Sequence, residues 1–219
     1  MTIRECGDSM LLVELAAVID PVVNERAIAL ASRLRGRRLR GVRDIAPGYC
    51  TVGVHFDPLQ TDLPALERAI ADEAAVVAEI ETLPVKTPIE IGVHYGGDDG
   101  PDLEAVAVHA GCTPAEVIAR HAARVYRVYM LGFVPGFAYM GRVDASIATA
   151  RHRVPRERVP AGSVGIAGEQ TGVYPVASPG GWQLIGRTSR LMFDPKRTPP
   201  SLLAPGDLVR FIPIAGRRP

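Results

Sequence analysis

The pattern of apolar and polar positions predicts alternating strands and helices over the first 95 residues. Compact apolar runs favour strands, whereas apolar residues that recur every three or four positions favour helices. The expected elements are a strand at 10–15, a helix at 21–36, strands at 42–45 and 51–56, a helix at 61–80 and a strand at 88–93. This order is typical of a split βαβ arrangement, so we assign residues 1–95 to a ferredoxin-like domain.

Cap and turn residues support these boundaries. Asp20 followed by Pro21 is a helix N-cap with proline at the first helical position, and Gly36 supplies a stop for the same helix. Thr61 and Asp62 begin the second helix in the same way.

The pattern changes after residue 95. Residues 96–124 predict two bridging helices, the second of which begins at Thr113 with the threonine and glutamate of a capping box. From Val125 onward helical periodicity disappears, and glycine, proline and β-branched residues alternate with short apolar runs. This is typical of a β-barrel, which we expect over residues 125–219. The predicted fold class is therefore α+β.

Composition excludes several classes of partner. The formal charge is +1, from 25 basic and 24 acidic residues, so no overall field attracts nucleic acid or an anionic membrane. The three cysteines form no CxxC pair, which fits a reducing compartment better than a disulfide framework or a zinc site. The first apolar run is too short for a signal peptide or a membrane span. We expect a cytoplasmic protein without a nucleic-acid or membrane partner.

One segment imitates a phosphate-binding loop. Residues 181–188 match the spacing of a P-loop, with Arg187 in place of the usual lysine. A P-loop requires a glycine-rich turn that opens a helix, but here Trp, Gln, Leu and Ile intervene and a strand-like run follows. We reject the motif, so any ATP is expected to bind another polypeptide.

The histidines do not indicate a metal site, because none has a partner at ligand spacing. A structural or surface role is the commoner one for His94 and His121, and contact with substrate or proton transfer is the alternative. The alternative is stronger for His121, which precedes the aromatic loop described next. Six arginines lie between residues 33 and 43. The favoured interpretation is a solvent-exposed helix end, and the alternative is a patch that binds an anion or a partner.

The loop at 130–141 is unusual because it combines Gly and Pro with several large apolar side chains: Phe133, Pro135, Phe137, Tyr139 and Met140. A short loop can hardly bury all of these at once. The loop either plugs the barrel or lines a pocket. The plug is favoured, because aromatic residues more often belong to a core than to a site.

Three segments, 126–141, 158–168 and 170–188, resemble the B-type component of 5-oxoprolinase, a family also described as allophanate hydrolase subunit 1 and as a sporulation kinase inhibitor. The residues from His94 to Gly97, those from Pro101 to Leu103, and the pair Gly206 and Asp207 fit the same family pattern. The resemblance implies a ferredoxin-like domain followed by a cyclophilin-like barrel. It also implies an ATP-dependent hydrolase of the cytoplasm, in which C-type and A-type subunits join this one to cleave 5-oxo-L-proline to L-glutamate.

Nine residues are expected to bind the small-molecule substrate: His121, Phe133, Pro135, Phe137, Tyr139, Gln170, Thr171, Trp182 and Arg187. Arg187 is the candidate for gripping a carboxylate, with a local salt bridge as its alternative role. Gln170 and Thr171 suit an amide, and the aromatic rings would exclude water. No nucleophile or general base stands out in the sequence, so we expect a hetero-oligomeric site and no activity of this chain alone.

Two other functions remain open from the sequence. The chain could inhibit a histidine kinase without performing chemistry, or it could belong to a carboxyltransferase that acts on urea or allophanate. One fold supports several chemistries, so fold alone does not choose between them. In each case we expect this chain itself to bind neither metal nor biotin, with ATP held by a partner subunit.

Overall fold

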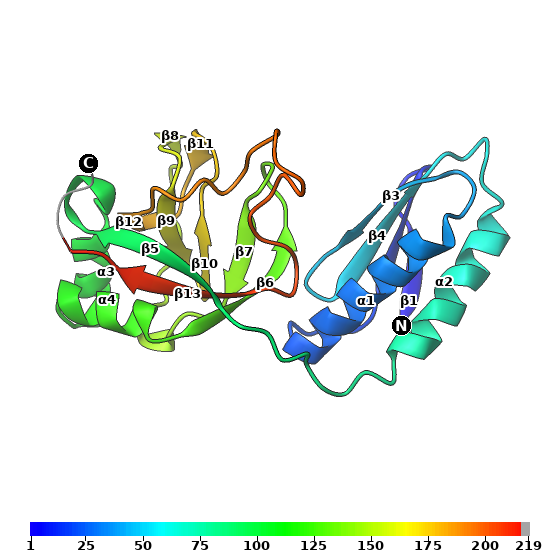
Figure 1. The fold of residues 1–219 in the computed structure, drawn as a ribbon, viewed down its shortest axis with the longest axis horizontal. Coiled ribbons are helices and arrows are strands. Elements are labelled where there is room, and N and C mark those ends of the chain that lie inside the picture. Colours follow the sequence, from blue (N-terminus) through cyan, green and yellow to red (C-terminus); the bar gives the residue numbers. More distant parts are fainter. Residues whose placement is uncertain (216–219) are drawn as a thin grey trace. The chain divides into compact units, whose positions relative to one another are not determined.

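The computed structural model describes residues 1–215 and divides into two compact units, Met1–Val85 and the part from Lys86 onward (Figure 1). Residues 216–219, which end the expected barrel domain, lie outside the described residues. No helix within residues 1–215 is both long and apolar enough to cross a bilayer.

The first unit is a four-stranded sheet with two helices (Figure 1). The strands are β1 (Thr2–Glu5), β2 (Met10–Glu14), β3 (Val42–Pro47) and β4 (Thr51–Phe56), and their order in the sheet is β1-β2-β4-β3. Helices α1 (Pro21–Arg37) and α2 (Leu63–Val77) pack against each other, and α1 also contacts β3 and β4. Leu11, Val13, Leu30, Leu34, Val54 and Ile70 belong to the core that these elements share.

Both helices of the first unit begin as expected. The Asp20 carboxylate accepts hydrogen bonds from the backbone N–H groups of Val22 and Val23 at 2.8 and 3.1 Å, and Asp62 caps α2 in the same way. The end of α1 differs from the prediction, because the helix passes Gly36 and ends at Arg37. Arg38 then adopts the left-handed conformation, with φ of 47°.

The assignment of strand 88–93 to the first unit was wrong. It forms β5 (Ile89–Tyr95), which pairs with β12 and β13 of the barrel. The sheet edge beside β2 is occupied by β1, which pairs antiparallel with β2. Alternating apolar residues fit any half-buried strand, so the pattern identified β5 but not its sheet. The ferredoxin-like order is therefore not confirmed.

The second unit contains the expected barrel, which closes in the order β10-β7-β6-β13-β5-β12-β9. Its other strands are β6 (Val125–Leu131), β7 (Ala138–Gly141), β9 (Ser163–Ala167), β10 (Gln170–Val173), β12 (Gln183–Arg187) and β13 (Leu208–Pro213). Strands β5 and β13 run parallel and every other neighbouring pair is antiparallel. A cyclophilin-like topology stays a prediction from the resemblance.

Shorter elements surround the barrel. Strands β8 (Arg156–Val159) and β11 (Ser178–Gly180) form a separate two-stranded sheet. The two helices expected within 96–124 are α3 (Leu103–Ala110) and α4 (Pro114–Ala122), and the capping box at Thr113 is present. They contact β12 and β13 respectively, so they belong to the barrel unit rather than to a separate bridge. Single turns of 3-10 helix lie at Gly97–Asp99 and Ala145–Ile147.

Candidate functional site

The nine predicted site residues all lie in the second unit, but not in one place. His121 and Thr171 are completely buried. Phe137, Tyr139 and Trp182 belong to an aromatic cluster that is distinct from the main barrel core, and Phe133 contacts two of its rings. Arg187 and Gln170 lie at the ends of β12 and β10, and Pro135 is exposed in the loop. The predicted set is thus divided between the inside of the barrel and its surface.

His121 and Thr171 form part of a buried chain of hydrogen bonds. The Thr171 hydroxyl donates its one proton to the carbonyl of Gly165 at 3.0 Å. Its oxygen, 2.9 Å from Nε2 of His121, must then accept the proton that this nitrogen carries. Nδ1 of His121 accordingly accepts from the Tyr95 hydroxyl at 2.7 Å. The network therefore assigns the proton of the neutral imidazole to Nε2.

Burial keeps His121 uncharged. Desolvation lowers the pKa of this imidazole to about 3 and raises the pKa of the Tyr95 hydroxyl that bonds to it. The imidazole ring also stacks on Phe211, with centroids 4.8 Å apart. A neutral, fully paired and enclosed histidine fits the structural role that the sequence analysis considered first.

The aromatic cluster has Phe137 at its centre. The Phe137 ring meets those of Tyr139, Tyr174, Trp182 and Phe133 edge-on, at centroid distances of 4.9, 5.2, 5.3 and 5.6 Å. Such T-shaped contacts add to the stabilisation that apolar burial provides. Phe137 is 1% exposed but Phe133 is 59% exposed. The cluster therefore has a closed centre and an open edge.

Two glycines let the cluster lie against the barrel wall. A Cβ atom at Gly172 would lie 3.1 Å from the Phe137 ring and 3.2 Å from the Trp182 ring, and one at Gly165 would lie 3.0 Å from Cβ of Trp182. Any other residue at these positions of β10 and β9 would press on the rings. The glycines therefore provide a flat floor for the aromatic side chains.

The expectation that the loop plugs the barrel holds for Met140 but not for Phe137 and Tyr139. Tyr126, Val128, Met140 and Phe211 belong to the main barrel core, whereas Phe137 and Tyr139 belong to the separate cluster. Alternation along β7 explains this division, because consecutive side chains of a strand point to opposite faces. Met140 points inward, so its neighbour Tyr139 points outward.

Asp102 fixes the segment that carries Trp182. Its carboxylate accepts from the backbone N–H of Leu184 at 2.6 Å and pairs with Arg156 at 2.6 Å, while its own N–H donates to the Leu184 carbonyl at 2.9 Å. Arg156 also donates to the Trp182 carbonyl at 3.4 Å. His152 joins this group, with Nε2 3.3 Å from the second carboxylate oxygen. The backbone at Trp182 and at Leu184 is thus held by one buried carboxylate and its arginine.

Sequence reasoning missed this group. The local pattern indicates Asp102 only as the start of a helix, yet its side chain makes no capping bond to α3. Its partner Leu184 lies 82 positions later in the sequence, and no local pattern links the two. Tyr174 likewise stands out in the sequence only as part of a motif, and in the structure it contacts the central ring of the cluster.

Arg187 braces a turn next to the cluster. The Nε atom of Arg187 donates to the carbonyl of Ala161 at 2.8 Å. Gly162, which follows Ala161 in the turn, donates its N–H to the carbonyl of Tyr174 at 2.7 Å. Arg187 is paired across the sheet with His94 of β5 and Ser163 of β9. The guanidinium is half-buried and oriented by a backbone acceptor. Gln170 lies across from Gly141 and Ala167 at the start of β10.

The P-loop-like segment does not form a phosphate loop. The P-loop-like residues form β12, whose backbone pairs with β9 and β5 instead of opening a helix, so rejection of that motif is confirmed. These residues therefore do not fit a nucleoside triphosphate. No group of three or more His, Cys, Asp or Glu side chains is placed to hold a metal ion in the described part of the chain.

Comparisons with known sequences identify the family. A model of the carboxyltransferase domain, subdomain C and D, matches residues 1–203. The B-type 5-oxoprolinase component of Bacillus subtilis (strain 168) is 39% identical over 97% of this chain and 92% of its own length. The B-type 5-oxoprolinase component of Escherichia coli O157:H7 is 44% identical over 94% of this chain and 93% of its own length.

Solved structures share the fold. The crystal structure of TTHA0988 matches with a TM-score of 0.84 and 36% identity, covering 100% of this chain and 41% of that one. The K. lactis urea amidolyase matches with a TM-score of 0.77 and 22% identity, covering 97% of this chain and 15% of that one. This chain thus spans less than half of either solved chain, and the second likeness shows the fold alone. Because the family model and both bacterial relatives align with most of its length, this chain belongs to the carboxyltransferase subdomain C and D family, together with the B-type components of 5-oxoprolinase.

Proposed function

We propose that this chain is a non-autonomous subunit of an ATP-dependent 5-oxoprolinase of the cytoplasm. With C-type and A-type partner subunits it helps to cleave 5-oxo-L-proline to L-glutamate, and ATP binds to a partner. The observation that carries the proposal is the match to two B-type 5-oxoprolinase components over 94% and 97% of the chain. An aromatic cluster with one exposed edge supports a site that this chain shares with a partner subunit.

The aromatic cluster is the part of this chain that we assign to the substrate. Its closed centre around Phe137 and its open edge at Phe133 give a rigid apolar surface on which the methylene groups of a five-membered lactam can pack. Covering that surface with a partner would exclude water, which strengthens every polar contact within the site. Tyr139 and Trp182 border the same surface, and the exposed Pro135 lies two residues after Phe133 in the loop.

Arg187 is assigned the carboxylate of the substrate. A guanidinium binds a carboxylate in a bidentate manner, and the half-buried position of Arg187 limits competition from water. Gln170 lies opposite Ala167, four residues along β9 from Ser163, the partner of Arg187, which is about 13 Å at the usual rise of a strand. Gln170 is therefore not assigned to the same small substrate molecule as Arg187. His121 and Thr171 have no exposed surface, so we assign them a positioning role, in which their hydrogen bonds hold β10 and β9 together beneath the cluster.

Reconstitution tests the proposed function. The isolated chain is expected to show no 5-oxoproline-dependent ATP hydrolysis, and adding A-type and C-type subunits should produce both ATP hydrolysis and glutamate. Substantial turnover by the isolated chain would contradict the shared site. Turnover of urea or allophanate in place of 5-oxoproline would instead favour the carboxyltransferase alternative, and inhibition of a histidine kinase without any turnover would favour the binding alternative.

A further inference from the structure

The arginines around the end of α1 border a cavity of about 240 Å³ in the first unit. Arg35, Arg38 and Arg43 line it, together with the apolar side chains of Leu34, Leu39, Val42 and Ile45 and the carboxylate of Asp44. Leu34 and Ile45 are buried core residues, so the floor of the cavity is fixed. Three arginines therefore line a cavity whose base is apolar.

Around this cavity, arginine side chains outnumber carboxylates. Six arginines lie between residues 33 and 43, and the carboxylates that contact them or line the cavity are those of Glu73, Asp57 and Asp44. Glu73 pairs with Arg33 and Arg37 outside the cavity, and Asp57 pairs with Arg43 at 2.7 Å. Six arginines against three carboxylates leave a surplus of three positive charges.

Two of the lining arginines have no carboxylate partner among the described residues. Arg35 donates to the backbone carbonyl of Ile45, which leaves its charge uncompensated. Arg38 has neither a hydrogen bond nor an ion pair from its side chain within residues 1–215. A guanidinium presents several N–H donors in a planar fork that matches the oxygens of a phosphate group. The cavity thus offers donors and charge that the protein itself does not use.

The backbone at Arg38 is also unusual. With φ of 47° it occupies the left-handed position after a helix, where glycine is the favoured residue. Gly36 is available two residues earlier, yet the helix continues past it. An arginine in this conformation costs stability, so its presence is better explained by what its side chain does than by the turn.

We propose that this cavity binds a small phosphate-bearing anion. At about 240 Å³ the cavity is smaller than the pockets of about 300–1,000 Å³ that hold drug-sized ligands, which favours a small anion. A nucleoside attached to the phosphate would lie outside and add little to binding. Asp44 opposes an anion in the same cavity and so weakens the affinity.

Titration of the full chain with inorganic phosphate at constant ionic strength tests the proposal, with chloride as the balancing anion. Saturable binding at one site is expected, detected by calorimetry or by amide chemical shifts around Arg38. Adenosine monophosphate should bind within about threefold of phosphate and adenosine should not bind, because the phosphoryl group is the ligand. Binding of adenosine alone, or no saturation by phosphate, would overturn the proposal.

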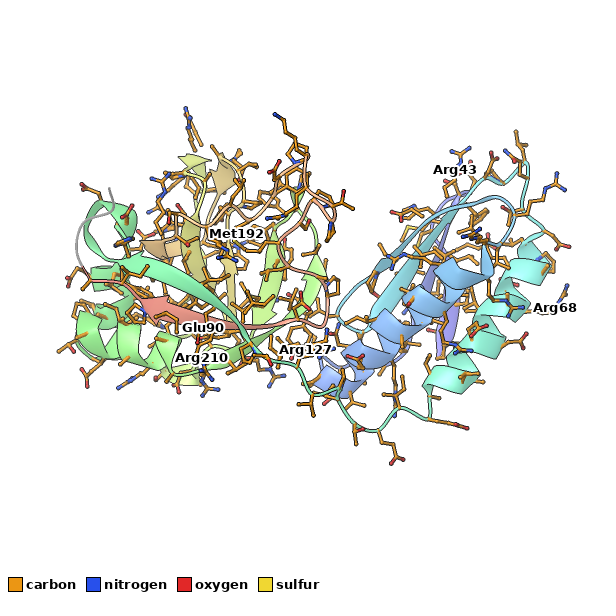
Figure 2. All side chains as sticks on the ribbon, in the orientation of Figure 1. Arg43, Arg68, Glu90, Arg127, Met192 and Arg210 are labelled. Atoms are coloured by element: carbon orange, nitrogen blue, oxygen red, sulfur yellow. The ribbon has the colours of Figure 1, made fainter. Side chains whose placement is uncertain are left out.

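Variants make the test specific. Arg38→Gly removes the guanidinium but keeps the left-handed turn, so it should melt no lower than the wild type while weakening phosphate binding at least tenfold. Asp44→Asn should strengthen binding. Arg68→Ala is the matched control, because Arg68 lies on the exposed side of α2 away from the cavity-lining Arg43 (Figure 2). Equal losses in Arg38→Gly and Arg68→Ala, or capture of a glutamate-rich peptide but not of phosphate, would refute a phosphate site.

Discussion

Phe133 and Phe137 contact each other in one cluster, but they differ in exposure and therefore in how mutation affects stability. Phe137 is enclosed by other rings, and truncating such a side chain to alanine typically costs about 3–5 kcal/mol of stability. Phe133 is mostly exposed, so its removal leaves the core intact. An effect of Phe133 on activity can therefore be separated from an effect on folding, which is not possible for Phe137.

Arg187 has two roles that differ in their energetic consequences. If it binds the substrate carboxylate, Arg187→Ala should cost the assembled complex about 2–5 kcal/mol of transition-state stabilisation. This corresponds to a decrease in kcat/KM of about 30-fold to several thousand-fold. If it only braces the Ala161 carbonyl, the loss should appear in the thermal melt of the isolated chain instead. Steady-state kinetics beside a thermal melt distinguishes the two roles. Arg190→Ala, an exposed arginine three residues later, is the control.

Titration of His121 should make the protein sensitive to mild acid. Its folded pKa of about 3 lies below the unfolded value of about 6.5, so below pH 6.5 the unfolded state binds a proton that the folded state does not. Stability is therefore lost as the pH falls from 6.5 towards 3, by up to about 1.4 kcal/mol per pH unit.

Urea denaturation between pH 6.5 and 4.5 measures this slope. His121→Gln removes the titrating group, and its stability should fall less steeply than that of the wild type. His109→Gln, on the exposed side of α3, should keep the wild-type slope. Identical slopes in all three proteins would show that His121 is not neutral in the folded state.

At the scale of elements, the placement of Trp182 depends on α3 and β8, because Asp102 and Arg156 hold the backbone around it. Asp102→Asn weakens the ion pair while keeping the side-chain volume. Since Arg156 is partly exposed, we expect a loss of about 1–3 kcal/mol, less than for a fully buried pair.

Trp182 is the single tryptophan of the chain, so fluorescence reports directly on this segment. Its emission in Asp102→Asn should shift to longer wavelength and become easier to quench with acrylamide. Asp98→Asn, at an exposed position in the preceding turn, should leave the emission unchanged. An unaltered spectrum in Asp102→Asn would show that the carboxylate does not position Trp182.

The membership of β5 in the barrel predicts where the chain can be divided. A fragment of residues 86–219 keeps β5 and should unfold cooperatively by itself. A fragment of residues 96–219 loses the buried Ile91 and Val93 together with the partner strand of β13, so it should not fold. Near-ultraviolet circular dichroism and thermal melts of both fragments provide the comparison. Cooperative unfolding of the shorter fragment would place β5 outside the barrel core.

At the scale of the whole molecule, the sequence predicted what depends on neighbouring residues. The caps at Asp20, Asp62 and Thr113 form with partners two or three positions away, and the change to sheet after Val125 is visible in composition. Phe137 was placed in the right segment but on the wrong side of the barrel wall. The face of a strand depends on its register in the closed barrel, which local patterns do not reveal.

Long-range contacts account for the other differences. β5 joins β13, more than a hundred residues later, and Asp102 binds the backbone of Leu184. The nine site residues were predicted from their side-chain chemistry and from sequence motifs. Neither of these shows whether a side chain is buried, and in the structure some of the nine are buried and others are exposed. His121 and Thr171 lie inside the barrel, while the aromatic rings form a surface.

The central claim is that the open edge of the aromatic cluster forms part of a site completed by partner subunits. The most direct test is kcat/KM for 5-oxoproline of the reconstituted complex carrying Phe133→Ala, beside the same complex carrying Leu191→Ala. Leu191 is a similarly exposed apolar residue of the second unit, at 57% compared with 59% for Phe133. We predict a loss of at least tenfold for Phe133→Ala, less than twofold for Leu191→Ala, and melting temperatures of both isolated variants close to that of the wild type. Equal kcat/KM values in the two variants and the wild type would contradict the account.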